Sequence, residues 1–230
     1  MSDLHLHTVF SDGAFPPVKI VESAIESGLT EIGFCDHFNT TKTQSLRPDA
    51  LAGYLDLLDD LAERHRADII IRKAVEIDLR SVFLNGTGIP RDSDLERLDY
   101  VLFEYASEKL LTGIPLKHTL DLRASIPKPT GLAHTDLMDC FPKHSNEDLI
   151  AMLQSAEVFI ECNDSYYRPG EMVPYYQYLS ACAGLIRTSG LRISCGSDMH
   201  DNLDDLGAER ANIWIRVNGL QSNQLKLGAP

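Results

Sequence analysis

The sequence has little of what marks several common protein classes. Its 5 cysteines are widely spaced and never form a C-x-x-C motif, so neither a disulfide framework nor a cysteine zinc site is predicted. Basic residues are scarce: 21 lysines and arginines stand against 34 acidic residues, and the formal net charge of −13 disfavours nucleic acid as a partner. No apolar run approaches the roughly 20 residues that span a bilayer. The first residues, MSDLHLH, lack the basic start and apolar core of a signal peptide. We therefore expect a cytoplasmic protein with no membrane partner.

Short apolar runs alternate along the chain with amphipathic helical stretches. Strands are expected at 4–7, 30–37, 69–78, 99–105, 130–134, 158–162 and 192–198. Helices are expected at 16–28, 49–67 with Asp49 at its start, 116–126, 145–156 with Ser145 as its cap, and 174–190. The segment after residue 78 reads as a loop, and the stretch after residue 198 as short and polar. About seven strand-then-helix units predict an α/β fold whose parallel strands form a sheet or a barrel, with no linker that would divide it.

Histidines and acidic residues collect where the predicted strands end. In chain order they are His5 and His7, Asp36 and His37, Glu76, Glu104, His134, Glu161 and Asn163, and Asp198 and His200. In a parallel α/β barrel the functional groups lie at the carboxyl ends of the strands, so these side chains are expected to meet at one end. Because strand side chains alternate between faces, both histidines of the first pair point to the same side, as do Asp198 and His200.

Each of these residues also has an ordinary structural explanation. Eight histidines among 230 residues give about 0.3 H-x-H pairs by chance, and residues 11–13, SDG, are typical of a turn. Glu76 could simply pair with Arg72 or Lys73. The histidines expected in solvated helices or in a loop are His65, His118 and His144. Convergence at several strand ends favours a metal site, because so many imidazoles and carboxylates would repel one another or stay unsatisfied without cations.

The ordered set of motifs is similar to that of one known family. The motifs are DLHLHTVFSDG, GFCDHFNT, AVEIDL, GLAHTDL, FIECNDSYYRPG and CGSDMH, which together run from Asp3 to about Asp201. This set resembles the PHP (polymerase and histidinol phosphatase) superfamily of metal-dependent phosphoesterases. The resemblance implies a distorted (β/α)7 TIM-like barrel that forms a single domain over residues 1–230. It also implies two to three divalent metal ions at the strand ends, and imidazole with carboxylate ligands suits zinc, manganese or iron.

The resemblance further implies a role for each residue at the strand ends. One metal would be held by His5, His7, Glu76 and Asp198, a second by Glu76 as a bridge and by His134, and the third by Asp12, His37 and His200. Glu76, Asp198 and His200 are also assigned to catalysis, and Arg168 to substrate binding. Asp36 is expected to accept a hydrogen bond from a ligand histidine and so to orient it.

One position departs from the family pattern. Members usually carry a second-metal histidine at the end of the fourth strand, where this chain has Ala106, and Glu104 would replace it if the strand register differs. The implied activity is hydrolysis of a small phosphomonoester, with histidinol phosphate as the family precedent, by a hydroxide that bridges two metals. Two alternatives stay open: a phosphodiesterase or nuclease of the same family, and a metal-binding protein with a degenerate second site and no turnover. The sequence carries no signal for an oligomeric state.

Overall fold

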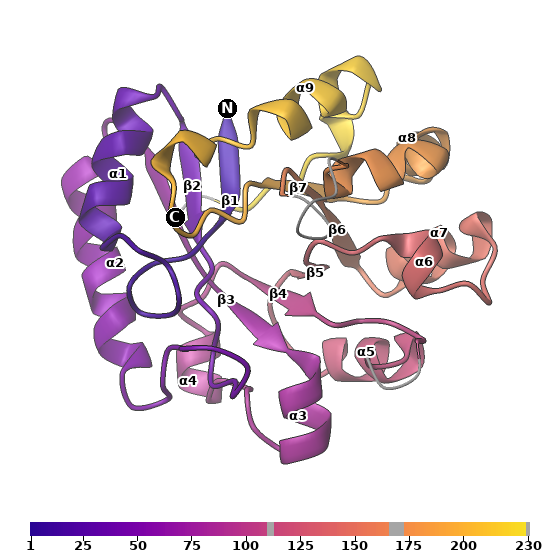
Figure 1. Ribbon diagram of the computed structural model, residues 1–230, viewed down its shortest axis with the longest axis horizontal. Helices are drawn as coiled ribbons and strands as arrows, with labels where there is room; N and C mark the ends of the chain where they lie inside the picture. Colours follow the sequence, from indigo (N-terminus) through magenta and orange to yellow (C-terminus); the bar gives the residue numbers. More distant parts are fainter. Residues whose placement is uncertain (110–112, 166–172, 229–230) are drawn as a thin grey trace.

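The structure is a computed structural model that describes residues 1–109, 113–165 and 173–228. Seven parallel strands follow one another in chain order around a ring, and helices lie outside it (Figure 1). The strands are β1 (Ser2–Leu6), β2 (Glu31–Phe34), β3 (Ile70–Asp78), β4 (Tyr100–Glu104), β5 (Thr130–Leu132), β6 (Val158–Asn163) and β7 (Ile193–Gly196). The helices are α1 (Pro17–Glu26), α2 (Leu51–His65), α3 (Leu79–Asn85), α4 (Asp92–Leu95), α5 (Leu116–Arg123), α6 (Leu137–Cys140), α7 (Asn146–Ser155), α8 (Ala183–Ser189) and α9 (Glu209–Val217). The 3-10 helices among the described residues are η1 (Tyr175–Cys182), η2 (Leu203–Asp205) and η3 (Gln221–Asn223).

The ring comes together between its first and last strands. The backbone N–H of His7, just after β1, donates to the carbonyl of Met199, just after β7, at 3.0 Å. Near the start of β1, the buried carboxylate of Asp3 accepts hydrogen bonds from the backbone N–H groups of Ser197 at 2.9 Å and Gly207 at 2.8 Å. Because of this closure, the ends of β1 and β7 lie side by side although almost the whole chain separates them.

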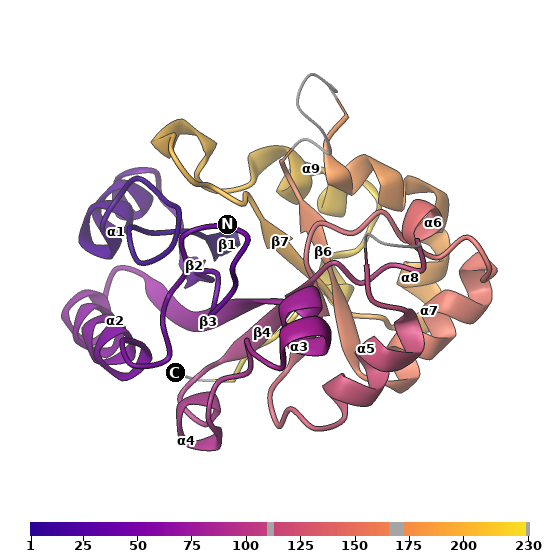
Figure 2. The ribbon, with the colours of Figure 1, turned by 60° about the horizontal axis from the view of Figure 1, so that its bottom comes forward.

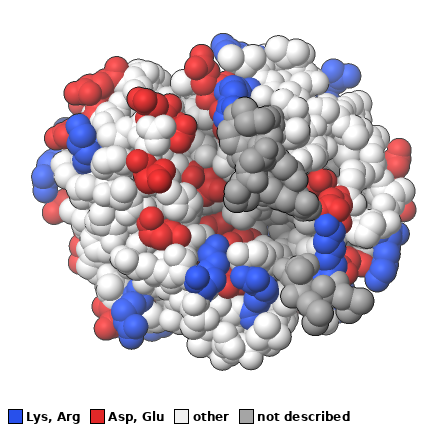
Figure 3. Space-filling view, viewed as in Figure 1, with Lys and Arg blue, Asp and Glu red and all other residues white. Residues whose placement is uncertain are grey.

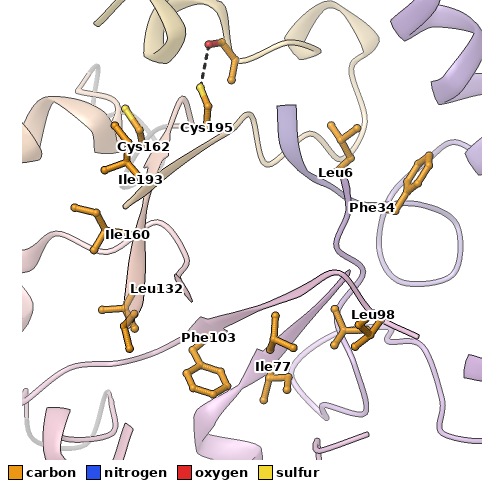
Figure 4. Packing of buried hydrophobic residues seen from close by; sticks show 14 of the residues in the cluster. Leu6, Phe34, Ile77, Leu98, Phe103, Leu132, Ile160, Cys162, Ile193 and Cys195 are labelled. Atoms are coloured by element: carbon orange, nitrogen blue, oxygen red, sulfur yellow. Dashed lines mark hydrogen bonds between the residues drawn. The ribbon is translucent and has the colours of Figure 1, made fainter. Parts of the chain in front are cut away.

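Apolar side chains fill two layers, one outside the strands and one inside the ring. The outer layer packs the strands against the helices, and Figure 4 shows Ile77, Phe103, Leu132 and Ile160 pointing outward from their strands. The inner layer consists of Leu4, Cys35, Ala74, Tyr100, Leu102, Ala133 and Phe159. The alternation of side chains along each strand separates the two layers and leaves polar strand-end residues facing inward.

The structure confirms the α/β barrel and extends the predicted helices. The segment after β3 holds α3 and α4 where a loop was expected: the side chain of Asp78 accepts from the N–H groups of Arg80 and Ser81 and starts α3 directly at the strand end. The stretch expected to be short and polar after β7 contains α9, which buries Ala211 and Ile215 one turn apart. Figure 2 shows α9 beside β7, completing the outer layer there.

Two predicted helix starts have different outcomes. Ser145 caps α7 by accepting from the N–H of Asp148, as expected. Asp49 makes no such bond: α2 begins at Leu51 after Ala50, without a side-chain cap. The helix expected over 174–190 begins as the 3-10 helix η1 before it continues as α8. Among the described helices, none is long and apolar enough to cross a membrane.

Candidate metal centre

The residues predicted as ligands all lie at the carboxyl end of the ring. They are His5 on β1, His7 and Asp12 after it, His37 after β2, Glu76 on β3, His134 after β5, and Asp198 and His200 after β7. Half of them, His5, His7, His37 and Glu76, are buried and the other four are partly buried, which is unusual for so many ionisable side chains unless each has a partner. The predicted convergence of strand ends is therefore present in the structure.

Four of these residues meet around one point. The Nε2 atoms of His5 and His7 lie 3.0 Å apart, and each lies 3.6 Å from Oε2 of Glu76. Oδ1 of Asp198 lies 3.6 Å and 3.2 Å from the same two nitrogens. Ligand atoms about 2.1 Å from one tetrahedral metal ion would lie about 3.4 Å from each other, so this spacing suits a shared cation.

A second group surrounds the carboxylate of Asp12. Its Oδ1 lies 3.4 Å from Nε2 of His200 and 3.7 Å from Nδ1 of His7, and its Oδ2 lies 3.6 Å from Nε2 of His37. Thr43 donates to Oδ2 at 3.0 Å and fixes the carboxylate. One ligand atom from each of these four residues fits within 4.8 Å of the others.

A third group forms where Glu76 faces the end of β4. Ligand atoms of His37, Glu76 and Glu104 also lie within 4.8 Å of one another, and Nε2 of His134 lies 2.8 Å from Oε1 of Glu76. Ala106, the residue at the position where the family usually has an imidazole, is buried and lines the same pocket without offering a ligand atom. Glu104 thus provides a carboxylate close to the place of the missing histidine.

In two of the histidines, a hydrogen bond from Nδ1–H to an oxygen of the protein determines which ring nitrogen faces the centre. Nδ1–H of His5 donates to Oε1 of Glu161 at 2.8 Å, and Nδ1–H of His200 donates to the carbonyl of Asp198 at 2.8 Å. In the neutral form of each ring this leaves the lone pair on Nε2, the nitrogen that faces the other ligands. A side chain at Gly196 would begin 2.1 Å from Oε1 of Glu161, so glycine is needed there to admit that carboxylate.

Within the described part of the chain, four buried ligand atoms have no hydrogen bond. They are Oδ1 of Asp12, Nδ1 of His37, Oε2 of Glu76 and Oε1 of Glu104. Nδ1 of His37 and Oε2 of Glu76 lie only 2.8 Å apart, but without the alignment of a hydrogen bond. Buried polar atoms without a hydrogen bond are rare and costly, and divalent cations bound among these four would satisfy them. The residues present therefore fit divalent metal ions with imidazole and carboxylate ligands.

The electrostatics of the site follow from burial and crowding. Burial, together with the nearby imidazoles of His200 and His5, lowers the pKa of His7 to about 4, so its ring is neutral near pH 7. Burial and the adjacent charge of Glu76 raise the pKa of Glu104 to about 7. Glu76 itself is held ionised: burial opposes its charge, but His37 and His5 keep its pKa well below the usual range.

Three residues at the site have left-handed backbone conformations that are unfavourable for side chains with a Cβ. Tyr105 has φ 64° just after β4, His134 has φ 30° after β5, and Asp198 has φ 58° after β7. Such conformations cost on the order of 1–3 kcal/mol each, and they concentrate at functional sites. Here they turn the chain sharply at the strand ends and aim two of the predicted ligands into the centre.

The prediction for Asp36 needs correction. Its carboxylate accepts from the N–H and hydroxyl of Thr8, from the hydroxyl of Ser11 and from the phenol of Tyr54, so in the described structure it binds no histidine directly. Ser11 in turn lies 3.4 Å from Nδ1 of His7. Asp36 therefore organises the turn that follows β1, whereas the carboxylate that orients a ligand histidine belongs to Glu161, whose role the sequence did not reveal.

A pocket of about 530 Å³ opens above the ligand atoms. Besides five of the predicted ligands it is lined by Lys42, Glu104, Tyr105, Ala106, Ser107, Lys109, Ala133, Thr135, Cys140, Ser165 and Tyr175. Figure 3 shows acidic side chains inside the central hollow and basic side chains around its rim. The pocket is therefore open to a small anionic molecule that metals at its floor would attract.

Other sequence expectations have simpler outcomes. Arg168 lies outside the described residues. Glu76 does not pair with Arg72 or Lys73 in the structure; these bind Glu31 and Asp59, respectively. Of the remaining histidines, His118 is exposed, and His144 lies 3.4 Å from Glu108 just before α7.

Comparison with known proteins shows the family of this chain and structures of similar fold. The sequence model of the PHP domain matches residues 3–193. The chain belongs to the PHP domain family. Its fold is similar to that of histidinol phosphate phosphatase from Lactococcus lactis, whose structure holds zinc, L-histidinol and phosphate (22% identity, 99% of this chain and 96% of that chain, TM-score 0.67). It is also similar to a chain from the structures of YwqE of Bacillus subtilis and CpsB of Streptococcus pneumoniae, described as metal-dependent tyrosine phosphatases (16% identity, 100% and 98% coverage, TM-score 0.54). No curated protein matched the sequence.

Proposed function

We propose that this PHP domain protein is a metal-dependent phosphatase that hydrolyses a small phosphomonoester. The observation that carries the proposal is the convergence of buried ligand atoms, four of them without a hydrogen bond in the described residues, beneath an open pocket of about 530 Å³. The two phosphatases of similar fold support this reaction class. The proposal treats residues 1–230 as one barrel domain, because the strands of the ring come from almost the whole length of the chain.

Three positions for divalent ions are proposed from the ligand groups. The first metal position is formed by His5, His7, Glu76 and Asp198. The group around Asp12 gives the third position, with Asp12, His37 and His200 as ligands. The second combines Glu76 and His134 with the carboxylate of Glu104, which takes the role of the imidazole absent at Ala106. Oε1 of Glu104 has no hydrogen bond in the described residues, which supports this replacement and argues against a degenerate second site. Zinc, manganese and iron all suit this ligand set.

The protein's own residues would prepare the site for phosphoryl transfer. Metals bound at these positions would supply a hydroxide near neutral pH and offset the charge on phosphate oxygens. The catalytic residues of the proposal are Glu76, Asp198 and His200, because they would bind the metal ions and set the distance between them. Glu161 keeps Nε2 of His5 turned toward that centre. Arg168 stays a prediction as a substrate-binding residue, since a guanidinium can hold two phosphate oxygens at once.

The test is activity of the metal-loaded protein on a panel of esters. Phosphomonoesters, including histidinol phosphate and phosphotyrosine, are compared with phosphodiesters and short oligonucleotides at equal concentrations. The proposal predicts turnover of at least one monoester and much slower or no cleavage of diesters. Preference for the diesters would instead favour the phosphodiesterase alternative. Absence of turnover on the whole panel, in protein with its full metal content, would favour a metal-binding protein without activity.

A further inference from the structure

Lys42 reaches into the pocket from the loop that follows His37. The loop is closed at its base by backbone pairing of Phe38 with Leu46 and crossed by a hydrogen bond from Ser45 to the carbonyl of Thr40 at 2.9 Å. From this loop the ammonium of Lys42 extends to the end of β4 and donates to Oε2 of Glu104 at 2.5 Å. The lysine is thus held in place by a carboxylate at the edge of the proposed metal centre.

The ammonium of Lys42 has hydrogen-bonding capacity left for a ligand. A lysine offers three N–H donors, and in the described structure Glu104 is its one hydrogen-bond acceptor. The ring of Tyr105, with its centre 5.2 Å away, lies on another side of the ammonium. Lys42 lines the pocket together with Asp12, His37 and His200, and its side chain is 23% exposed. The remaining donors are therefore available to a molecule bound in the pocket.

Charge and fixed position make Lys42 suited to an anion. The carboxylates around the proposed metals would repel a phosphate, so a cation at their edge favours binding of phosphate oxygens. Because Glu104 and the Tyr105 ring already hold the ammonium, little further ordering is needed when a ligand arrives. Lys109, the other described lysine of the pocket, instead binds the carboxylate of Asp139.

We infer that Lys42 is a substrate-binding residue that donates a hydrogen bond to a non-bridging phosphoryl oxygen while its other contact, to Glu104, fixes its position. The inference rests on the proposed function, because it assigns the pocket to a phosphate ester. It adds a protein cation to the metals and the predicted Arg168. Glu104 would then have two roles: one carboxylate oxygen holds the ammonium of Lys42, and the other is proposed to face a metal.

The experiment measures binding of inorganic phosphate to the metal-loaded protein by calorimetry. Lys42→Met is expected to weaken phosphate binding by about tenfold or more, the scale of losing one charge-assisted hydrogen bond. Lys42→Arg, which keeps the charge and the donors, is expected to stay within about threefold of the wild type. Lys117→Met is the matched control, because Lys117 also pairs with a carboxylate, Asp121 at 2.6 Å, but lies on the exposed surface of α5. Metal content of every variant is measured in parallel and is expected to be unchanged.

Two results would overturn the inference. One is wild-type phosphate affinity in a fully metallated Lys42→Met variant. The other is loss of metal in Lys42→Met together with its phosphate binding, which would make Lys42 a positioning residue for Glu104 and not a phosphate ligand. Failure of the proposed function looks different: phosphate would still bind through Lys42 while no ester in the panel was hydrolysed.

Discussion

At the scale of single residues, the site depends on where each imidazole carries its proton. In His5 the proton on Nδ1 is held by the carboxylate of Glu161, and in His200 it is held by the carbonyl of Asp198. Once the proton on Nε2 has been displaced, a ring fixed in this way presents its lone pair without rotating, which strengthens metal binding. The acceptors are therefore as much a part of the centre as the ligands are.

Protonation at two ligands predicts a pH dependence for metal binding. Burial opposes the charged imidazolium, but Glu76 raises the pKa of His134 to about 9, and Asp12 with Asp198 raises that of His200 to about 9. Near pH 7 both rings are therefore positively charged imidazolium ions in the metal-free protein. A metal must displace one proton from each ring, because only a neutral imidazole is a ligand. Metal affinity should rise with pH, by up to about tenfold per pH unit for each proton displaced, and level off near pH 9.

Calorimetric titration of the metal-free protein with manganese at pH 7 measures this effect. Buffers with different ionisation enthalpies report the number of protons released, and we expect at least two for a fully loaded chain, one each from His134 and His200. Release of none, or an affinity that falls as pH rises from 6.5 to 8, would mean that His134 and His200 are not ligands.

At the scale of elements, the strand ends could be predicted and the loops that join them could not. Alternation and the parallel barrel rule place His5, His7 and Glu76 at one end of the ring, because each depends only on its own strand. The Lys42–Glu104 pair depends on how the loop after β2 folds toward β4. No local pattern in the sequence specifies that path, so Lys42 was not identified as a site residue.

The prediction missed α9, because most of its residues are polar and its apolar face is short. The window of α9, ERANIWIRV, contains Ala211 and Ile215 one turn apart, but Glu209, Arg210 and Arg216 give it a polar appearance. The role of Glu161 was missed for a different reason: its partner, His5, is 156 residues away in the chain. Alternation marks such a residue as inward-facing, but it does not name the partner.

The end of β4 carries the prediction that is most specific to this chain. Glu104→Gln keeps the shape of the side chain but removes the charge that a metal would neutralise. If Glu104 is a ligand, affinity for one of the bound ions should fall by more than the roughly 10- to 100-fold that loss of an orienting neighbour causes. Manganese titration of the metal-free variant, with circular dichroism to verify folding, measures the change.

The matched control for this substitution is Glu108→Gln, four residues further along. Glu108 pairs with Lys143 at 3.3 Å and does not line the pocket, so its removal should leave every metal affinity unchanged. Equal metal binding in wild type and in folded Glu104→Gln would show that the second position does without this carboxylate.

At the scale of the whole molecule, the acidic balance is consistent with a reaction on phosphate only if metals are present. A formal net charge of −13 repels an anionic substrate, and the carboxylates in the central hollow add to that repulsion (Figure 3). Bound divalent ions reverse the sign locally, at the floor of the pocket. The metal-free protein should consequently have little affinity for phosphate.

The central claim is that the strand ends of this barrel hold a multinuclear metal centre, and elemental analysis tests it most directly. Protein purified after growth with manganese and zinc supplied should contain at least two divalent transition-metal ions per chain. The same count is expected for His65→Ala, since His65 lies at the end of α2 and away from the pocket, and a lower count for His7→Ala, which loses a ligand. One ion or none in the wild-type protein, or the same count in His7→Ala as in the wild type, would contradict the account.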